Sequence, residues 1–538
     1  MLIRDSILLA ALAGISVGVR AEVSFERLLN AANDPDNWLN YSSTYDNQRF
    51  SRLRQINRGN VDELELQWIW QARSLEKFEA TPLVVDGILY TVQAPNDIVA
   101  LDAKTGRVFW SYHHENLPNA RACCGAVNRG LAILGETLFM GTLDAHMIAV
   151  DAVSGQLKWK TRVADAADFY SITMSPLVIE DKVFIGTGGG DGGANGMIVA
   201  YDVETGSEIW RFHTIPRPGE PGNETWSGES WREGGAAVWN HAAFDPETRL
   251  AFWGTGNPAP DWDGSVRLGD NLYSDSVVAL NVDTGELAWH YQFTPHDELD
   301  YDSTQVPILA DVEWQGEERK AMLWANRNGL MYLLDRVTGE FLNGRPFVSV
   351  NWMDGFDKNG RPNQVIFPSQ EGTEFRPHVH GATNWAPASY SPRTGLYYVS
   401  HWEDSATVAV AGEFPRPAGV NTRQTAMGQI DQQRFFNSED EAHGVIRAYQ
   451  PETLEQVWEF TMADITWAGT LATGGDLVFG GGREGYFFAL DAEDGELLWR
   501  ASVGGQVNAG PMSYAVDGKQ YIAIAAGNSL FTFALPDD

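Results

Sequence analysis

A repeated pattern limits the folds open to this chain of 538 residues. The pattern Ala-Leu-Asp-x-x-Thr-Gly-x-x-x-Trp is clearest at 100–110 and returns, with variations, at 149–159, 200–210, 279–289, 448–458 and 489–499, and more loosely at 243–253. Degenerate copies at 333–343 and 389–399 keep the turn but lose the tryptophan. An alternating run that turns at Thr-Gly and returns to Trp predicts an antiparallel hairpin in each copy.

The spacing of the copies favours an all-β propeller. They begin 36 to 59 residues apart, and repeats of roughly 40 to 50 residues with several strands each are typical of propeller blades. The 54 Gly and 20 Trp scattered along the chain also fit short strands joined by tight turns. A solenoid is the alternative. The propeller is preferred because the strand-like run 520–535 can complete a blade with strands near the N-terminus, and closure removes exposed edges.

The first residues predict an export signal. Arg4 precedes the apolar run 7–19, and Val19-Arg20-Ala21 places small residues at positions −3 and −1 of a cleavage site. We therefore expect a signal peptide at 1–21 and a single domain at 22–538, in the periplasm. A short membrane anchor is the alternative, but the run is shorter than the ~20 residues that a spanning helix needs, so we expect no stable membrane insertion.

Charge excludes some partners. Lys and Arg total 38 against 72 Asp and Glu, which gives a net charge of −34. Such a surface repels phosphates, so nucleic acid and anionic membranes are disfavoured, whereas cations and basic proteins are natural partners. The long irregular segments 216–235 and 411–443 interrupt the repeat, and loops of this length are usually functional.

Three local patterns are candidates for chemistry. The adjacent Cys123 and Cys124 lie about 3.8 Å apart at their Cα atoms, below the usual disulfide range, so a strained bridge and two neighbouring thiols both remain open. Asp300 and Asp302, two residues apart, join Asn257 as an oxygen set for a hard cation, or form a solvated strand end. Asp191 lies in a glycine tract without the Lys-Ser/Thr of a nucleotide loop.

Taken in this order, the motifs resemble the quinoprotein alcohol dehydrogenases, the methanol/ethanol dehydrogenase family that uses pyrroloquinoline quinone (PQQ) in an eight-bladed propeller. The resemblance covers nearly all of 22–538. It rests on the Trp repeats, on Cys-Cys-x-x-x-Asn-Arg at 123–129, on Gly-Thr-Gly-Asn-Pro-Ala-Pro at 254–260 and on Asp-Tyr-Asp at 300–302.

The resemblance implies a cofactor slot and a metal site. A disulfide between Cys123 and Cys124 would form one wall of the slot, with the Trp239 indole opposite it. The polar rim would comprise Glu79, Arg129, Thr173, Asn384 and Trp467. The metal ligands fall on Asp191, Asn257 and Asp300, and the additional acid Asp302 resembles the lanthanide-dependent branch, which favours a lanthanide(III) over Ca²⁺. Two residues depart from the family pattern: Asp191 replaces the usual Glu, and Gly188 replaces the usual Ser.

The resemblance also implies the reaction. Asp300 would take the hydroxyl proton of an alcohol as hydride moves to the quinone, and Arg327 would hydrogen-bond the quinone oxygen, giving an aldehyde or ketone. This sequence has no Cys-x-x-Cys-His haem motif, so the electron acceptor would be external, such as a basic cytochrome c. Two alternatives remain: a non-catalytic propeller scaffold, and a quinoprotein for sugars or polymeric alcohols with its specificity in 411–443.

Overall fold

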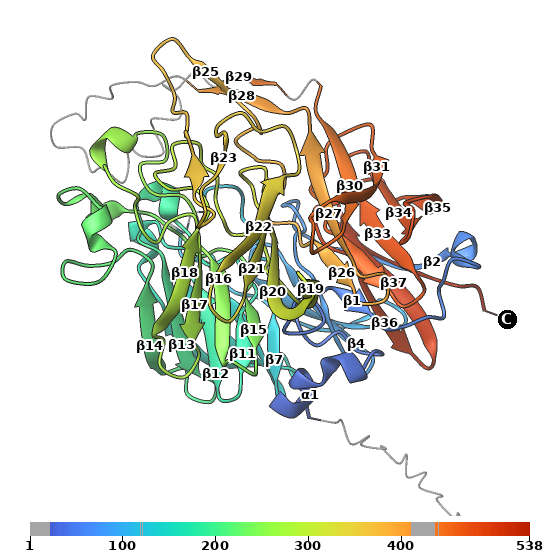
Figure 1. Cartoon of the computed structure of the whole chain (residues 1–538). Helices are drawn as coiled ribbons and strands as arrows, with labels where there is room; N and C mark the ends of the chain where they lie inside the picture. The colour runs from blue at the N-terminus through green and yellow to red at the C-terminus, as the bar shows by residue number, and fades with distance from the viewer. Residues whose placement is uncertain (1–21, 119, 121, 410–435, 439–440, 538) are drawn as a thin grey trace, which may run out of the picture.

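The predicted repeat folds as a ring of eight antiparallel sheets (Figure 1). The computed structural model describes residues 22–118, 120, 122–409, 436–438 and 441–537. The predicted signal peptide and most of the segment 411–443 lie outside the described residues. Within the described part, no helix has the length and apolar character needed to cross a membrane.

Each of these eight sheets is one blade, and in seven of them the four blade strands come in chain order. The first four blades are β3 (Leu83–Val85), β4 (Ile88–Gln93), β5 (Asp97–Asp102) and β6 (Val108–Tyr112); β7 (Ala132–Leu134), β8 (Thr137–Gly141), β9 (His146–Asp151) and β10 (Leu157–Arg162); β11 (Leu177–Ile179), β12 (Lys182–Gly186), β13 (Met197–Asp202) and β14 (Glu208–His213); β15 (Ala243–Asp245), β16 (Leu250–Gly254), β17 (Ser276–Asn281) and β18 (Leu287–Gln292).

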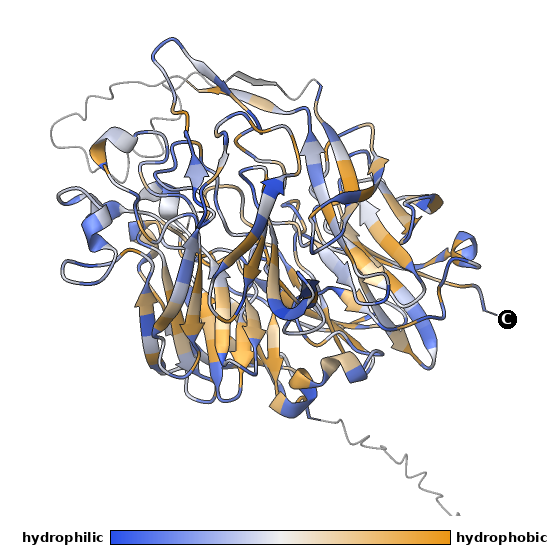
Figure 2. Cartoon of the chain, viewed as in Figure 1, coloured by the Kyte–Doolittle hydropathy of each residue, from blue (hydrophilic) through white to orange (hydrophobic). Residues whose placement is uncertain are grey.

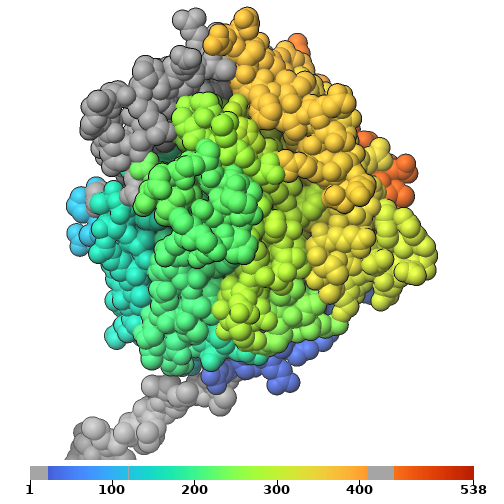
Figure 3. Space-filling view, turned by 60° about the vertical axis from the view of Figure 1, so that its left-hand side comes forward, coloured from blue at the N-terminus to red at the C-terminus, as the bar shows by residue number. Residues whose placement is uncertain are grey.

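The next three blades follow the same order. They are β19 (Ile308–Trp314), β20 (Glu317–Ala325), β21 (Leu330–Asp335) and β22 (Phe341–Pro346); β26 (Ser389–Ser391), β27 (Leu396–Glu403), β30 (His443–Tyr449) and β31 (Gln456–Thr461); β32 (Leu471–Thr473), β33 (Leu477–Gly481), β34 (Tyr486–Asp491) and β35 (Leu497–Ser502). Figure 3 shows neighbouring blades side by side in chain order. Two small sheets lie outside the ring: β23 (Gly355–Phe356) with β24 (Pro362–Asn363), and β25 (Thr373–Phe375) with β28 (Ala406–Ala409) and β29 (Phe436–Ser438).

The eighth blade joins the two ends of the chain. After α1 (Phe25–Leu29), β1 (Phe50–Ser51) pairs in parallel with β32 of the seventh blade. The eighth blade consists of β2 (Glu65–Gln71), which pairs with β38 (Ser529–Ala534), followed by β37 (Lys519–Ala526) and β36 (Met512–Val516). This confirms the expectation that the final strands complete a blade with an N-terminal strand. The closed ring excludes the solenoid.

Most of the sequence copies are the outer hairpin of a blade. Ala100 faces Trp110 and Ala149 faces Trp159 in antiparallel register, with an irregularity at the turn side of each pair. Two copies, 243–253 and 389–399, are antiparallel hairpins as predicted, but they are the first hairpins of their blades, β15–β16 and β26–β27. Alternation and turn residues are the same in both hairpins, so the local pattern cannot tell them apart.

The repeat tryptophans join neighbouring blades. A Cβ added to the turn glycine Gly155, whose φ is +71°, would lie 2.6 Å from Trp110 of the preceding blade. The same contact recurs between Gly206 and Trp159. The Trp159 indole N–H also donates to the carbonyl of Val203 at 3.0 Å. The glycine of each turn therefore makes room for the tryptophan before it.

This packing makes Gly155→Ala a test of blade docking. The matched control is Gly395→Ala, because Gly395 has φ +69° but no atom of the described residues lies within 4 Å of the added Cβ. Left-handed backbone costs an alanine about 1–2 kcal/mol at either site, and the clash with Trp110 adds about 1–3 kcal/mol at Gly155 alone. We expect a larger fall in the thermal midpoint for Gly155→Ala. Equal shifts would contradict a docking role.

Burial separates the inner and outer strands. Every residue of β4 is buried, whereas the outermost strand β10 alternates between exposed and half-buried side chains. Figure 2 shows the apolar residues concentrated within the sheets and the hydrophilic ones at the turns. The core thus lies between successive blades.

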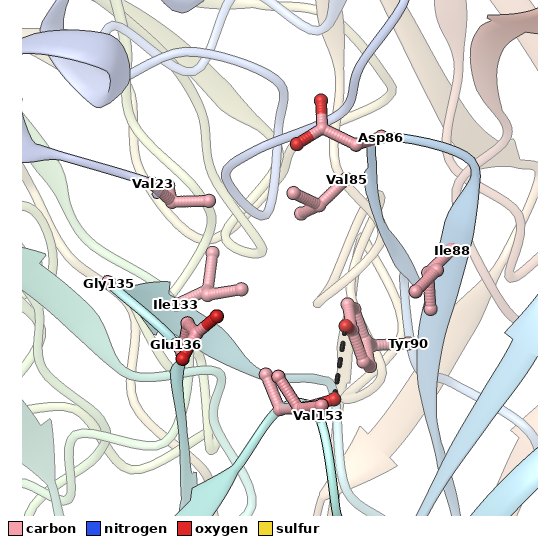
Figure 4. A pocket seen from close by; sticks show the side chains of 10 residues that line it. Val23, Val85, Asp86, Ile88, Tyr90, Ile133, Gly135, Glu136 and Val153 are labelled. Carbon is pink, nitrogen blue, oxygen red and sulfur yellow. Dashed lines mark hydrogen bonds between the residues drawn. The ribbon is translucent and has the colours of Figure 1, made fainter. Parts of the chain in front are cut away.

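The two ends of the ring differ. The turn after each first strand, such as Asp86 after β3, lies at the end opposite to the residues that precede that strand. A small pocket at this turn end is bordered by Val23, Asp86, Tyr90 and Glu136 (Figure 4), where the Tyr90 hydroxyl donates to the carbonyl of Ala152 at 3.2 Å. The predicted site residues all lie toward the other end.

Candidate active site

One topological rule brings the predicted residues together. In an antiparallel blade, the entry to the first strand and the exit from the second lie at the same end. Residues that precede a first strand are Glu79, Cys123, Cys124, Arg129, Thr173, Trp239, Asp300, Asp302, Asn384 and Trp467. Residues that follow a second strand are Asp191, Asn257 and Arg327. Thirteen residues spread over the chain therefore share one end of the ring.

Arg129 is the centre of a first cluster. It is buried, and its Nη2 lies 2.8 Å from Oε2 of buried Glu79, while its Nη1 donates to the Thr173 hydroxyl at 3.1 Å and to the Trp239 carbonyl at 3.3 Å. Its guanidinium carbon lies 4.9 Å from the centre of the Trp239 ring. Burial raises the pKa of Glu79, and the positive charge of Arg129 opposes that rise.

A third tryptophan, which the sequence did not predict, extends this cluster. Trp385 stacks on Trp467 with centroids 4.5 Å apart and planes 7° apart, and the Arg129 guanidinium lies 5.7 Å from the Trp385 ring. Asn384, the residue before it, donates its side-chain amide to the carbonyl of His380. Aromatic faces and a buried cation at one place suit a flat anionic ring system.

The adjacent cysteines form a disulfide. Cys123 and Cys124 are bonded, and both are exposed. The bridge lies in the loop before β7, five residues before Arg129. The open choice between bridge and thiols is thereby decided in favour of the bridge.

Chemistry can test the bridge directly. The protein purified in active form should have a mass two hydrogens below that of the dithiol, and iodoacetamide should label neither Cys123 nor Cys124 until a reductant is added. Denaturation without reduction is the control, since burial alone would then cease to protect a thiol. Labelling of unreduced, active protein would contradict the bridge.

Arg327 organises a second cluster. Its Nη2 donates to Asp300 Oδ2 at 2.8 Å, its Nη1 to Asp302 Oδ2 at 2.6 Å, and its Nε to the carbonyl of Val379 at 2.7 Å. Burial acts to lower the pKa of Arg327, but the charges of Asp300 and Asp302 raise it overall. Asp302 is 6% exposed, so it is not a solvated surface acid.

Asn257 is adjacent to the same carboxylates. Its backbone N–H donates to Asp302 Oδ1 at 3.0 Å. A Cβ added to Gly256 would lie 2.2 Å from that same oxygen. The glycine therefore allows Asp302 to approach the backbone that carries Asn257.

Asp300 and Asp302 were predicted to point the same way because they were placed on a strand. That local structure is wrong. The segment is a loop, and Asp300 has left-handed backbone with φ +56°. The loop is folded by Asp297, whose carboxylate accepts the N–H groups of Leu299 at 2.9 Å and Tyr301 at 2.7 Å. A capped turn, rather than strand alternation, directs both acids to Arg327.

Asp191 lies in the short 3₁₀ turn η4 (Gly190–Gly192). Desolvation raises the pKa of Asp191 to about 6, and the negative charge of Asp302 adds to the rise while Arg327 opposes it. The pKa of Asp300 is raised well above its usual value, first by burial and then by the charges of Asp302, Asp261 and Asp191, against the opposing effect of Arg327. These acids therefore act on one another. At Gly188, where the family pattern has Ser, an added Cβ would lie 3.0 Å from the Ser171 hydroxyl.

The strand entry at Ala237–Trp239 connects the two clusters. The N–H of Val238 donates to the carbonyl of Thr187 at 2.8 Å, and the Ala237 carbonyl accepts from the N–H of Gly256 at 2.7 Å. The segments that carry Asp191 and Asn257 are thus both hydrogen-bonded to the segment that carries Trp239. The ring stack and the acids belong to one site.

The oxygen atoms of the acids and of Asn257 are suited to binding a hard cation. Asp300 Oδ1 is buried and has no hydrogen-bond partner among the residues that the structure describes, and carboxylate and amide oxygens are the ligands that such ions prefer. As the side chains stand among the described residues, no three His, Cys, Asp or Glu groups are gathered closely enough to hold a metal. Arg327 occupies one oxygen each of Asp300 and Asp302, so binding a cation requires these side chains to readjust.

Comparison with known proteins identifies the family. The family described as PQQ, glucose/ethanol/alcohol dehydrogenase β-propeller domain, matches residues 38–350 and 440–522. The chain belongs to the PQQ-dependent alcohol dehydrogenases. It is therefore a quinoprotein oxidoreductase that acts on alcohols, and the alternative of a non-catalytic scaffold is excluded.

Individual relatives of this PQQ-dependent alcohol dehydrogenase cover almost all of it. The quinohemoprotein alcohol dehydrogenase ADH-IIG of Pseudomonas putida is 37% identical over 98% of this chain and 77% of the relative. The lanthanide-dependent methanol dehydrogenase of Methylacidiphilum fumariolicum is 33% identical over 97% of this chain and 90% of the relative. A solved europium-containing methanol dehydrogenase superposes with a TM-score of 0.88 at 31% identity, covering 95% of this chain and 100% of that one.

Proposed function

We propose that this chain oxidises an alcohol to an aldehyde or ketone with PQQ and one lanthanide(III) or Ca²⁺ ion, and passes the electrons to an external acceptor in the periplasm. The observation that carries the proposal is the buried arrangement in which Arg327 binds both Asp300 and Asp302, while Asp300 Oδ1 has no partner in the described part of the chain. Such an oxygen, beside a fixed cation, suits a proton acceptor.

The first cluster would hold the cofactor. Trp239 and the Cys123–Cys124 disulfide would enclose the ring system, and Glu79, Arg129, Thr173, Asn384 and Trp467 would border it. Arg129 Nε has no hydrogen-bond partner among the described residues, which leaves a donor for a carboxylate of the cofactor.

The second cluster would hold the metal. Asp191, Asn257, Asp300 and Asp302 supply only oxygen ligands. Burial of Asp302 favours a lanthanide(III), because a trivalent ion gains more than a divalent one from each added negative charge. The family members with lanthanide and europium in their names support the same choice.

Two side chains of this chain, Asp300 and Arg327, would take part in the reaction. When bound, the quinone and its cation supply the hydride acceptor. Asp300 would accept the hydroxyl proton of the alcohol, and Arg327 would favour the ionised form of that carboxylate and orient it while offering its charge to the oxygen that becomes negative.

The acceptor would be a basic protein such as a cytochrome c. The net charge of −34 favours association with a basic surface. The name of the quinohemoprotein relative indicates that it contains haem. This sequence has no Cys-x-x-Cys-His motif for haem attachment.

A dye-reduction assay tests the whole proposal. Metal-free protein would be given PQQ with Ca²⁺ or La³⁺ and offered primary alcohols, secondary alcohols and sugars. We expect turnover with alcohols only when PQQ and a metal are both present, and faster turnover with La³⁺. Preference for sugars would favour the alternative substrate class, and lack of PQQ-dependent turnover with any substrate would overturn the proposal.

A further inference from the structure

The loop that carries the Cys123–Cys124 disulfide has little regular structure of its own. It leaves the first blade after β6 and enters the second at β7, and the described residues of 117–127 belong to no helix or strand. Both cysteines are exposed. A loop that is ordered only when a ligand binds lowers the affinity, because the ordering costs conformational entropy. The position of the disulfide therefore depends on what holds the two ends of this loop.

One buried side chain, Asn96, connects both ends of the loop. It lies in the turn between β4 and β5 and is 1% exposed. Its Nδ2 donates to Asn116 Oδ1 at 2.5 Å, before the cysteines in the chain, and its Oδ1 accepts from Asn128 Nδ2 at 3.3 Å, after them. A single amide thus closes the loop at its base.

Backbone groups fix the orientation of these amides. The Leu143 N–H donates to Asn96 Oδ1 at 3.3 Å, which leaves Asn96 Nδ2 to face the start of the loop. Asn128 Oδ1 accepts from the Gly130 N–H at 3.1 Å, and Asn128 Nδ2 also donates to the Gly141 carbonyl at 2.8 Å. Because each of the two buried amides has a backbone partner of known polarity, the network has one consistent arrangement.

A carboxylate secures the start of the loop a second time. Asp144, in the turn between β8 and β9, is 1% exposed, and its Oδ1 lies 2.9 Å from Nε2 of buried His114. Its Oδ2 accepts from the N–H of Leu117 at 3.4 Å. The loop is therefore held by turns of both blades that it joins before it reaches the cysteines.

We propose that Asn96 is a positioning residue for the cofactor, because it holds the disulfide wall and Arg129 in place on the slot. The inference rests on the proposed function, in which these groups enclose the PQQ ring system. Asn128 directly precedes Arg129 in the chain, so release of the loop base would displace the disulfide and that guanidinium together. Asn96 acts through the loop.

The test is PQQ affinity, measured by equilibrium dialysis with the full-length chain in excess LaCl₃. Because Asn96 is fully buried, the variant is made at its half-buried partner: Asn116→Ala removes the oxygen that accepts from Asn96, and Asn116→Asp retains it. Loss of one buried hydrogen bond favours the released loop by up to about tenfold, and affinity falls with the fraction of chains in the held state. We expect Asn116→Ala to bind PQQ several-fold to about tenfold more weakly and Asn116→Asp to bind it like wild type.

Asn343→Ala is the matched control for a purely structural effect. The Asn343 side chain, in the fifth blade, is also half-buried; it donates to the Glu452 carbonyl at 3.1 Å and accepts from the Gly344 N–H at 2.9 Å. It should lower the thermal midpoint without altering PQQ affinity. Without cofactor, amide hydrogen exchange of the peptide that carries the two cysteines should be faster in Asn116→Ala and unchanged in Asn343→Ala.

The outcomes separate the two proposals. Wild-type PQQ affinity in Asn116→Ala, or an equal loss of affinity in Asn343→Ala, would overturn the positioning role of Asn96 and leave the proposed function intact. Failure of the wild-type chain to bind PQQ would overturn the proposed function and the positioning role with it.

Discussion

Asp300→Asn is expected to reduce turnover by about a thousandfold, within the 10²–10⁴ range of general-base catalysis, while the protein keeps its fold. The asparagine side chain can still accept the hydrogen bond from Arg327 Nη2, which Asp300 accepts at 2.8 Å. It cannot accept the hydroxyl proton, and it removes one negative charge from the metal site. The measurement is kcat of protein reconstituted with PQQ and metal, with bound PQQ and thermal midpoint determined on the same samples.

Glu298→Gln is the matched control for this experiment. Glu298 lies in the same loop, and its carboxylate is 3.5 Å from the ring of His296 rather than in the Arg327 cluster. We expect it to retain near wild-type turnover. If Asp300→Asn kept more than a few per cent of activity with full cofactor loading, Asp300 would not be the base.

Asp302→Ala is expected to reduce La³⁺-supported turnover much further than Ca²⁺-supported turnover. The Coulomb energy between a ligand and an ion scales with the charge of the ion, so removal of a buried carboxylate weighs more on a trivalent cation. The measurement is the metal concentration that gives half-maximal dye reduction, determined separately for the two ions.

Two further variants separate charge from packing at this position. Asp302→Asn retains an oxygen for the Asn257 N–H, which Asp302 accepts at 3.0 Å, and removes only the charge; it should show the same metal preference as Asp302→Ala. Asp191→Glu restores the longer side chain and should tighten both metals. Equal losses for La³⁺ and Ca²⁺ in both Asp302 variants would show that Asp302 does not select the ion.

The fold could be predicted from the sequence because each blade repeats a local pattern. The turn glycine and the tryptophan after it, as at Gly155 and Trp159, identify a hairpin without knowledge of its neighbours. The looser copy at 243–253 is a hairpin too, as predicted, but its Pro-containing turn joins the first two strands of a blade. Local chemistry identifies a hairpin but not its place in the blade.

The site was predicted through resemblance, and its missing parts have a physical reason. Asp300 and Asp302 converge because Asp297 folds their loop, and nothing in the alternation of the segment indicates that turn. Trp385 follows the predicted Asn384, yet it stacks on Trp467, which lies 82 residues further along the chain. The signal peptide at 1–21 and the domain limits at 22–538 stay predictions.

The pairing of β2 with β38 has a consequence for how the ring forms. Glu65 lies opposite Ala534, so the last blade needs residues from both extremes of the chain. Contacts between residues so far apart in sequence slow folding, because the entropy of the intervening chain is lost before the contacts form. Seven blades can assemble in chain order, but the edge of the eighth stays open until its last strands pair with β2. Until that step the chain is an open arc with two exposed sheet edges, and this is the stage at which it is most exposed to aggregation.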